Sequence, residues 1–556
     1  MKRTSPKYFI VGVLVASVAF VGYYIFSVEN NEITVTDISY AERLLGLEFS
    51  DAKRDSMIDG LTQYRESYQA IRDYNLDNSV PPSLLFNPIP ADFSFESEQT
   101  GIQLQTLPEV RLPDDPDDLA FYSIRELAEL INTQQITSVQ LTEFYLERLK
   151  TYGPVLECVV TLTEARAMRK AREADAEIAA GDYRGLLHGI PYGIKDLFST
   201  SDYKTTWGAV PFRDQMIDYD ATVVQKLEDA GAVLVAKLTL GALAWGDVWF
   251  GGKTRNPWDI TQGSSGSSAG SAAAVSAGLV PFAIGTETWG SIVSPATVNG
   301  VTGLRPTYGR VSRHGAMALS WSMDKVGPLT RNAEDAAIVF DAILGPDGKD
   351  QTLYDLPFNY ATEIDFSELR VGYVQKDFEA DYPFKTQDSL ALVTLRELGA
   401  ELIPIELPDL PVSSLSFILG AEAAAAFDEL TRSGKDDLMV RQVKNAWPNV
   451  FRQARFIPAV EYINANRIRY ELIQHMHALM QSVDLYVAPS WQGPNLLLTN
   501  LTGHPCVVVP NGFTEQGTPT SISFTGQLFN EGKVLAAAYA YQNATGYHQK
   551  HPELSR

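Results

Sequence analysis

"SSGSSAGSAAA", residues 264–274, is a run of small residues in the middle of a 556-residue chain, with apolar segments on both sides. The run passes directly into a stretch rich in alanine, the residue with the highest helix propensity. Flexible Gly/Ser linkers join separate domains and do not normally lead into a helix. The small hydroxyl side chains and glycines therefore indicate a structured loop with a chemical role.

A second Ser/Gly cluster follows the first after one expected helix and one apolar strand. It reads "GTETWGS" and ends at Ser291, whereas the first cluster centres on Ser267. Glycine tolerates positive φ and lets backbone amides approach a ligand closely. A row of N–H donors of this kind can stabilise a developing oxyanion. The pattern predicts Ser291 as a nucleophile beside such a row.

A serine nucleophile needs a base, and Lys195 is one candidate for it. This lysine lies in the otherwise apolar segment "GIPYGIKDLF", where burial would disfavour its charged form and lower its pKa. The alternative is a structural ion pair between Lys195 and its neighbour Asp196 at the end of a strand. The local sequence leaves both interpretations open.

Four segments carry a resemblance to a known family: "LLHGIPYGIKD", "GSSGSSAGSAAAV", "GTETWGSIVSPA" and "GLRPTYGRVS". In this order and at these separations they resemble the amidase signature family, over roughly residues 118–553. The resemblance implies a Ser-cisSer-Lys triad of Lys195, Ser267 and Ser291, with the two serines 24 residues apart. It also implies hydrolysis of carboxylic amides through an acyl-enzyme, without a metal or an organic cofactor.

The resemblance further assigns the backbone of Thr288, Trp289, Gly290 and Ser291 to an oxyanion hole. It places the Ser268 hydroxyl in the hydrogen-bond network of the triad.

Four positions depart from the family pattern. Trp289 and Ala269 stand where glycine is usual, Val293 where arginine is usual, and Glu287 where aspartate is usual. Trp289 adds aromatic surface and Val293 removes a cation, whereas the changes at Ala269 and Glu287 are expected to be tolerated. We therefore expect neutral aryl or alkyl amides as substrates, with esters and carbamates as further candidates. Trp245, Trp249 and Phe250 lie in a loop that often faces the substrate channel in this family, although a place in the core is equally compatible with them.

Strand-helix alternation predicts the fold class. The segments 189–198 and 232–240 read as buried strands, with an amphipathic helix at 221–231 between them, and strand character returns at 483–490 and 505–513. The expected fold is α/β, with a mixed, largely parallel central sheet covered by helices on both faces. Residues 350–480 are expected to form a helix-rich insertion or cap.

The amino terminus carries a separate signal. Basic residues in the segment 1–7 precede the uncharged segment 8–26, which as a helix would be about 28 Å long, close to the thickness of a bilayer core. This predicts a short cytoplasmic tail, a single-pass signal anchor, and a catalytic domain on the outer side of the cytoplasmic membrane. Cleavage as a signal peptide, followed by secretion, is the alternative. Residues 27–117 are expected to form a helical and extended extension before the amidase domain at 118–556.

Composition excludes some functions. Apolar residues make up 45% of the chain and charged residues 20%, a globular balance. The net charge of −23 argues against nucleic-acid binding, which requires clustered lysine and arginine. Two scattered cysteines (Cys158 and Cys506) and seven scattered histidines predict no metal site, and they leave a bridge between the cysteines undecided.

Other functions remain as alternatives. The chain could be the glutamine-hydrolysing subunit of a tRNA amidotransferase, a member of the same family. It could also be an inactive member that acts as a binding protein. A nucleophile elbow at Ser268 fits poorly, because a Pro- and Gly-rich loop precedes it instead of a strand. The oligomeric state, monomer or homodimer, stays open.

Overall fold

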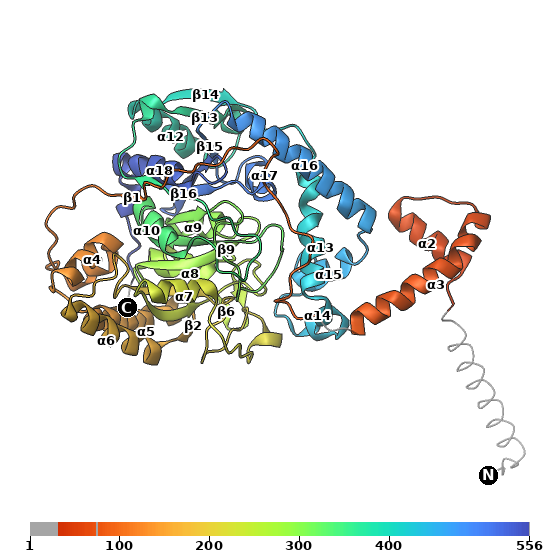
Figure 1. Ribbon diagram of the computed structural model, residues 1–556, viewed down its shortest axis with the longest axis horizontal. Coiled ribbons are helices and arrows are strands. Elements are labelled where there is room, and N and C mark those ends of the chain that lie inside the picture. Colours follow the sequence, from red (N-terminus) through yellow and green to blue (C-terminus); the bar gives the residue numbers. More distant parts are fainter. Residues whose placement is uncertain (1–31, 74–75, 555–556) are drawn as a thin grey trace, which may run out of the picture. The chain divides into compact units, whose positions relative to one another are not determined.

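The computed structural model describes residues 32–73 and 76–554, and contacts divide the chain into two units on either side of the bond between Asp77 and Asn78 (Figure 1). The first unit contains helices α2 (Val35–Leu45) and α3 (Asp51–Asp73). A buried carboxylate joins them, because Glu42 forms a 2.7 Å ion pair with Arg54.

The predicted tail 1–7 and membrane anchor 8–26 lie outside the described residues. Within the residues that are described, no helix has both the length and the apolar character needed to cross a bilayer.

The second unit is built on an eleven-stranded sheet. In spatial order its strands are β14 (Glu401–Ile405), β13 (Arg370–Val374), β15 (Leu485–Pro489), β17 (Pro519–Gly526), β16 (Cys506–Phe513), β10 (Thr302–Arg305), β11 (Lys325–Thr330), β9 (Phe282–Glu287), β3 (Pro191–Lys195), β4 (Val233–Leu238) and β2 (Val159–Leu162).

The prediction of a largely parallel sheet is wrong, although the sheet is mixed as expected. Within the described chain, six of the ten neighbouring strand pairs are antiparallel and four are parallel. A parallel pair requires a crossover connection, usually a helix. The turn 514–518 joins β16 to β17 directly, and the segment 306–324 joins β10 to β11 without a helix. These two connections reverse the strand direction in the middle of the sheet.

The helices of the second unit lie before, between and after these strands in the sequence. They are α4 (Ile124–Asn132), α5 (Ser138–Leu156), α6 (Glu164–Ala180), α7 (Thr222–Asp229), α8 (Ala269–Ser276), α9 (Val293–Asn299), α10 (Ala333–Ile343), α11 (Gln375–Glu379), α12 (Lys385–Glu397), α13 (Phe417–Ala426), α14 (Asp428–Arg432), α15 (Trp447–Ala454), α16 (Ala459–Met480), α17 (Asn495–Thr502) and α18 (Glu531–Thr545).

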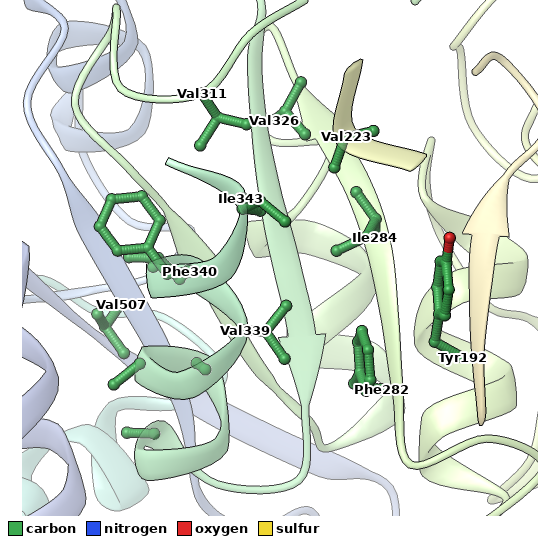
Figure 2. Close-up of a cluster of buried hydrophobic side chains, with 14 of the residues drawn as sticks. Tyr192, Val223, Phe282, Ile284, Val311, Val326, Val339, Phe340, Ile343 and Val507 are labelled. Carbon is green, nitrogen blue, oxygen red and sulfur yellow. The ribbon is translucent and has the colours of Figure 1, made fainter. Parts of the chain in front are cut away.

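Helices cover both faces of the sheet, as the sequence predicts. Successive side chains of a strand point to opposite faces. On β9, Phe282 and Ile284 contribute to a core with α7, α10 and α18 (Figure 2), whereas Ala283 contributes to a core with α8 and α9. On β16, Val507 and Val508 divide between the same two cores. Both faces of the central strands are therefore buried.

Two segments differ from their expected place. The segment 350–480 is helix-rich, but it also supplies β13 and β14 to the main sheet. The segment 78–117, expected to belong to an extension, falls within the second unit. There β1 (Ile102–Gln103) pairs in parallel with β12 (Tyr360–Ala361). Backbone pairing with a distant strand explains why this stretch belongs with the second unit.

Candidate active site

Lys195 is the last residue of β3, a fully buried strand between β4 and β9. β3 runs parallel to β9, with Ile194 opposite Ile284. Because the carboxyl ends of parallel strands lie at the same edge of a sheet, Lys195 comes close to the residues that follow Ile284 on β9. The fold thereby joins two motifs that are about 90 residues apart in the sequence.

The ammonium group of Lys195 is completely buried and is surrounded by hydroxyl groups. Its Nζ donates to Ser267 Oγ at 2.8 Å, Thr286 Oγ1 at 2.8 Å and Ser268 Oγ at 3.2 Å. Burial lowers the pKa of Lys195 to about 7, against the opposing effect of the negative charges of Asp324 and Glu287. Near neutral pH a large fraction of this lysine is uncharged and able to accept a proton.

The alternative ion pair between Lys195 and Asp196 does not form. The Asp196 carboxylate instead lies 2.9 Å from Nζ of Lys237, a second buried lysine on the neighbouring strand β4. Within residues 32–73 and 76–554, Lys195 has no carboxylate partner within ion-pair distance. Asp196 lies in the turn that follows β3, where its carboxylate also accepts from the N–H of Thr206 at 3.0 Å.

The Ser/Gly run forms a tightly enclosed loop before α8, and the peptide bond between Gly266 and Ser267 is cis. A Cβ atom at position 266 would lie 1.9 Å from the carbonyl oxygen of Gly246, so only glycine fits there. Gly285 on β9 is required for a similar reason, because its Cβ would lie 2.6 Å from Ser268 Oγ. The small residues therefore let the loop approach β9 closely.

Ser268 belongs to the network around Lys195, as the resemblance implies. Its hydroxyl donates to the carbonyl oxygen of Thr286 at 3.1 Å and accepts from the N–H of Thr286 at 3.2 Å. The N–H of Ser268 donates to the carbonyl oxygen of Ser291 at 3.1 Å. This last bond holds the two serine loops side by side.

The loop 288–291 has the backbone of an anion-binding turn. Gly290 adopts a φ of 86°, and Ser291 is 8% exposed. Within the described chain, the N–H groups of Trp289, Gly290 and Ser291 donate to no protein acceptor. Such groups are available to a bound oxyanion. Thr288 differs in that its side chain is engaged: its Oγ1 donates to Asp324 Oδ1 at 2.5 Å.

The buried carboxylate of Glu287 fixes this loop through hydrogen bonds. Glu287 Oε2 accepts the N–H groups of Ile292 and Val293 at 2.8 and 2.9 Å, and Oε1 accepts from Arg305 at 2.9 Å and from Asn500 at 2.7 Å. Burial alone would raise the pKa of Glu287, but Arg305 and these donors outweigh it and hold the pKa at about 2. The carboxylate fixes the turn that carries Ser291.

A cavity of about 130 Å³ lies next to this centre. Thr286 and Thr288 form part of its wall, and apolar side chains form much of the rest: Leu197, Ala244, Met317, Leu319 and Val326. Asp324, which also faces the cavity, is held by the N–H groups of Leu319 and Ser320. The apolar part of the wall suits an apolar group, while charged residues, among them Lys325 and Lys349, form another part of it.

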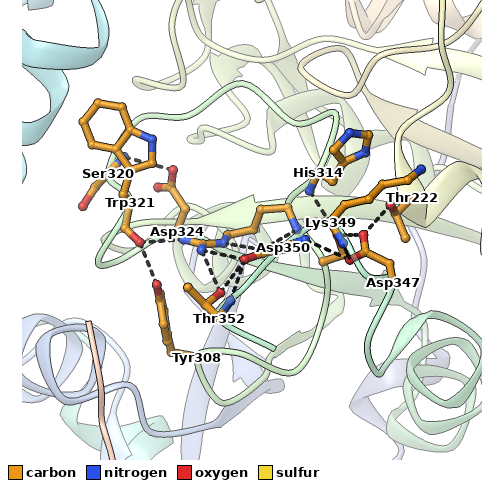
Figure 3. A network of polar contacts seen from close by, with 12 residues as sticks. Thr222, Tyr308, His314, Ser320, Trp321, Asp324, Asp347, Lys349, Asp350 and Thr352 are labelled. Carbon is orange, nitrogen blue, oxygen red and sulfur yellow. Dashed lines mark hydrogen bonds and ion pairs between the residues drawn. The ribbon is translucent and has the colours of Figure 1, made fainter. Parts of the chain in front are cut away.

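Polar contacts fix a further part of the cavity wall (Figure 3). Arg313 donates to both carboxylate oxygens of Asp350, to Thr352 Oγ1 and to the carbonyl oxygen of Trp321. Tyr308 donates to the same carbonyl oxygen at 2.7 Å. The Arg313 charge is thus neutralised by Asp350 and held within the wall.

Comparisons with known proteins identify the family of this chain. The family model described as Amidase matches residues 140–498. The chain belongs to the amidase family. It is 34% identical to the putative amidase AmiD of Mycobacterium bovis, over 79% of this chain and 98% of the relative. It is 33% identical to a component of the glutamyl-tRNA(Gln) amidotransferase of Coxiella burnetii, over 78% of this chain and 99% of the relative.

A solved structure supports the same assignment. The peptide amidase from Stenotrophomonas maltophilia superposes with a TM-score of 0.69 at 29% identity, over 78% of this chain and 98% of the other. The protein described here is therefore an amide-hydrolysing enzyme with the α/β amidase-signature fold.

The structure changes the interpretation of Val293 in this amidase. Val293, the first residue of α9, is fully buried in the core, so its side chain does not line a substrate site. Trp289 is 44% exposed and does add aromatic surface beside Ser291. Of the aromatic loop residues, Trp249 is nearly buried against Phe250, and the guanidinium of Arg441 covers Trp245. None of these three belongs to the cavity wall.

Sequence reasoning misses the residues that support the amidase site. It predicts no role for Thr286, Arg305, Asp324 or Asn500, and it treats Glu287 only as a tolerated change. One signal was available, because Glu287 and Arg305 are charged residues at the ends of otherwise apolar strands. Buried charges require partners. Which charges pair, however, depends on strands that are distant in the sequence.

Glu287→Gln should destabilise the enzyme by about 3–5 kcal/mol, because it leaves the buried Arg305 charge without its partner. Urea unfolding measures the loss. Glu109→Gln is the matched control: Glu109 and Arg111 form an ion pair whose side chains are 73% and 76% exposed, so about 0–1 kcal/mol is expected. Equal effects of the two variants would contradict a structural role for the Glu287 pair.

Proposed function

We propose that this enzyme hydrolyses neutral carboxylic amides through an acyl-enzyme on Ser291. One observation carries the proposal: a fully buried Lys195, with a pKa lowered to about 7, donates to Ser267 at 2.8 Å. A buried lysine with hydroxyl partners and without a carboxylate is suited to act as a base. Its neutral form would accept the Ser267 proton along this hydrogen bond.

The bond from the Ser268 N–H to the Ser291 carbonyl, which holds the two serine loops together, supports the remaining proposed steps. Ser267 takes the proton of the Ser291 hydroxyl, and the Ser291 oxygen attacks the amide carbonyl carbon. The free N–H groups of Trp289, Gly290 and Ser291 stabilise the oxyanion, with the Thr288 backbone as a further candidate donor. The proton returns through Ser267 to the leaving amine. Water then attacks the ester, with the same groups acting as base and acid.

The substrate preference rests on the cavity. Apolar side chains contribute a large share of its wall, and Trp289 adds exposed aromatic surface beside the nucleophile. Of the cations in the wall, Arg313 is paired with Asp350, and Lys325 and Lys349 are the others. Apolar contact contributes about 25 cal/mol per Å² of buried substrate area. Aryl and alkyl amides should therefore react faster than amides that carry a charged group, and esters and carbamates of the same shape are further candidates.

Glutamine hydrolysis is the second candidate, favoured by the 33% identity to a component of a tRNA amidotransferase. A panel of anilides, alkyl amides, glutamine and acetamide distinguishes the two. We expect the highest kcat/KM for an anilide or a long alkyl amide, and the lowest among the larger substrates for glutamine. Glutamine as the best substrate would refute the preference for neutral apolar amides.

We also propose that residues 8–26 anchor the enzyme, with the catalytic domain on the outer side of the cytoplasmic membrane. The uncharged segment behind a basic start supports this. Fractionation of cells producing the full chain should place it in the membrane fraction, accessible to added protease from outside. A shortened soluble product would indicate signal cleavage, and full-length soluble protein in the cytoplasm would refute the anchor.

A further inference from the structure

The segment 78–88, here called the strap, runs along the rim of the cavity beside the proposed catalytic centre. Asn78, Ser79, Pro81, Leu84 and Leu85 all belong to the cavity wall. The same wall includes threonine side chains next to the two serine loops. An apolar substituent can enter the cavity beside the nucleophile. If it is too long for the cavity, the part that projects would contact the strap.

The strap is fixed at its beginning. Asn78 donates to the carbonyl oxygen of Ala318 at 3.0 Å and accepts from the N–H of Ala318 at 2.8 Å. Ala318 itself belongs to the cavity wall. Pro81 and Pro82 follow, and each proline restricts the backbone to one φ region. This end of the strap is therefore tied to the loop that encloses the cavity.

The strap is also fixed at its end. The Phe86 ring packs edge-on against Tyr308 with 5.0 Å between centroids, and the Arg469 guanidinium lies 3.6 Å from the centre of the Phe86 ring. Asn87 accepts from the Tyr354 hydroxyl at 3.2 Å. Tyr308 belongs to the polar network that fixes the cavity wall (Figure 3). The strap is thus anchored on both sides of the leucine pair.

Both leucine side chains of the strap are exposed to solvent. Leu84 is 87% exposed and Leu85 is 45% exposed, although both lie at the rim of an apolar cavity. Isolated exposed leucines are ordinary, but two adjacent leucines on an anchored segment at a cavity rim are suited to contact a ligand.

The size of the cavity indicates what would reach them. It measures about 130 Å³, and a protein cavity of roughly 150 Å³ holds one benzene molecule. One ring or a short alkyl group therefore fills it.

We infer that Leu84 and Leu85 determine specificity for amides with a long apolar substituent, by contacting the part that projects beyond the cavity. This inference rests on the proposed amidase reaction at Ser291. The leucines are remote from the reacting carbonyl, so they bind ground state and transition state alike. Their contribution should then appear mainly in KM.

The test uses the full-length enzyme and two substrate series: acyl 4-nitroanilides from acetyl to dodecanoyl, and N-alkyl acetamides of the same lengths. In one of the series, wild-type kcat/KM should rise with chain length. Leu84→Ser/Leu85→Ser should lower kcat/KM for the longest members about tenfold, through KM, because the apolar area that they bury is lost. The acetyl and methyl members should change less than about twofold.

Two controls keep this test decisive. Leu390→Ser changes a leucine on α12 that is 52% exposed and away from the cavity wall, and it should leave both series unchanged. The single variant Leu84→Ser replaces the most exposed leucine and leaves the core unchanged. It takes the place of the double variant in the test if the double variant fails to fold.

Equal losses for short and long substrates, an equal effect of Leu390→Ser, or no dependence on chain length in either series would overturn the inference. Failure of the proposed function looks different: the wild-type enzyme would then hydrolyse no member of either series in a Ser291-dependent way.

Discussion

Ser291→Ala should lower kcat for amide hydrolysis by several orders of magnitude, because it removes the oxygen that forms the acyl-enzyme. The surrounding structure should persist, since the loop is held by backbone contacts: Glu287 binds the N–H groups of Ile292 and Val293, and Ser268 binds the Ser291 carbonyl. Steady-state turnover of an anilide measures the loss, and urea unfolding verifies that the variant is folded.

The hydroxyl of Ser294 provides a matched control for the Ser291→Ala variant. Ser294 lies three residues further on, and its Oγ accepts from the Trp491 indole at 3.3 Å. Ser294→Ala should retain activity, because this contact does not involve the proton path. A fluorophosphonate probe should label wild-type protein and Ser294→Ala but not Ser291→Ala. Undiminished hydrolysis by Ser291→Ala would refute the assignment of the nucleophile.

Lys195→Ala should abolish most of the activity, and the wild-type rate should depend on the protonation of Lys195. Burial lowers the pKa of this lysine to about 7, and only the neutral form can accept a proton. The base is therefore active above about pH 7, and kcat/KM should fall about tenfold per pH unit below it. A profile of kcat/KM from pH 5 to 9 measures the midpoint.

The variant Lys195→Arg distinguishes the effect of a positive charge at position 195 from the effect of a group that can accept a proton. Arginine keeps the positive charge and the donors, but it does not release its proton in proteins. This variant should be as inactive as Lys195→Ala at every pH. A rate that stays flat down to pH 5 in the wild type, with chemistry limiting turnover, would contradict a neutral lysine base, as would substantial activity in Lys195→Arg.

Part of the candidate site follows from local sequence. Local patterns predict Ser291 as a nucleophile and mark Lys195 as a charge in an apolar strand, whereas the role of Ser267 comes from the family resemblance. The strands at 191–195, 233–238, 485–489 and 506–513 lie within the predicted segments. Such features can be predicted from sequence because the periodicity of apolar side chains and the clustering of small residues are visible within a few neighbouring positions.

Local patterns predict the ends of elements less accurately. α4 begins after a capping serine, Ser123, whose hydroxyl accepts from the N–H of Glu126. α5 begins at Ser138, and Thr137 caps it although Ser138 is also a residue type that favours caps. The Ser138 hydroxyl instead donates to the Gly189 carbonyl oxygen at 2.9 Å. A tertiary partner, 51 residues away, competes here with the local cap.

The amino-acid sequence alone was sufficient to predict the α/β class and the buried strands, because these depend on patterns carried by neighbouring residues. The proposed triad of Lys195, Ser267 and Ser291 came from the resemblance of four sequence segments to a known family. Strand direction and charge pairing required the three-dimensional structure. The helix-free connections 306–324 and 514–518 reverse the central strands, Asp196 pairs with Lys237 and not with Lys195, and Glu287 finds Arg305 on a different strand. Coulombic and hydrogen-bond energies in a dry interior act between whichever groups the fold brings within a few ångströms, and sequence separation does not limit that choice.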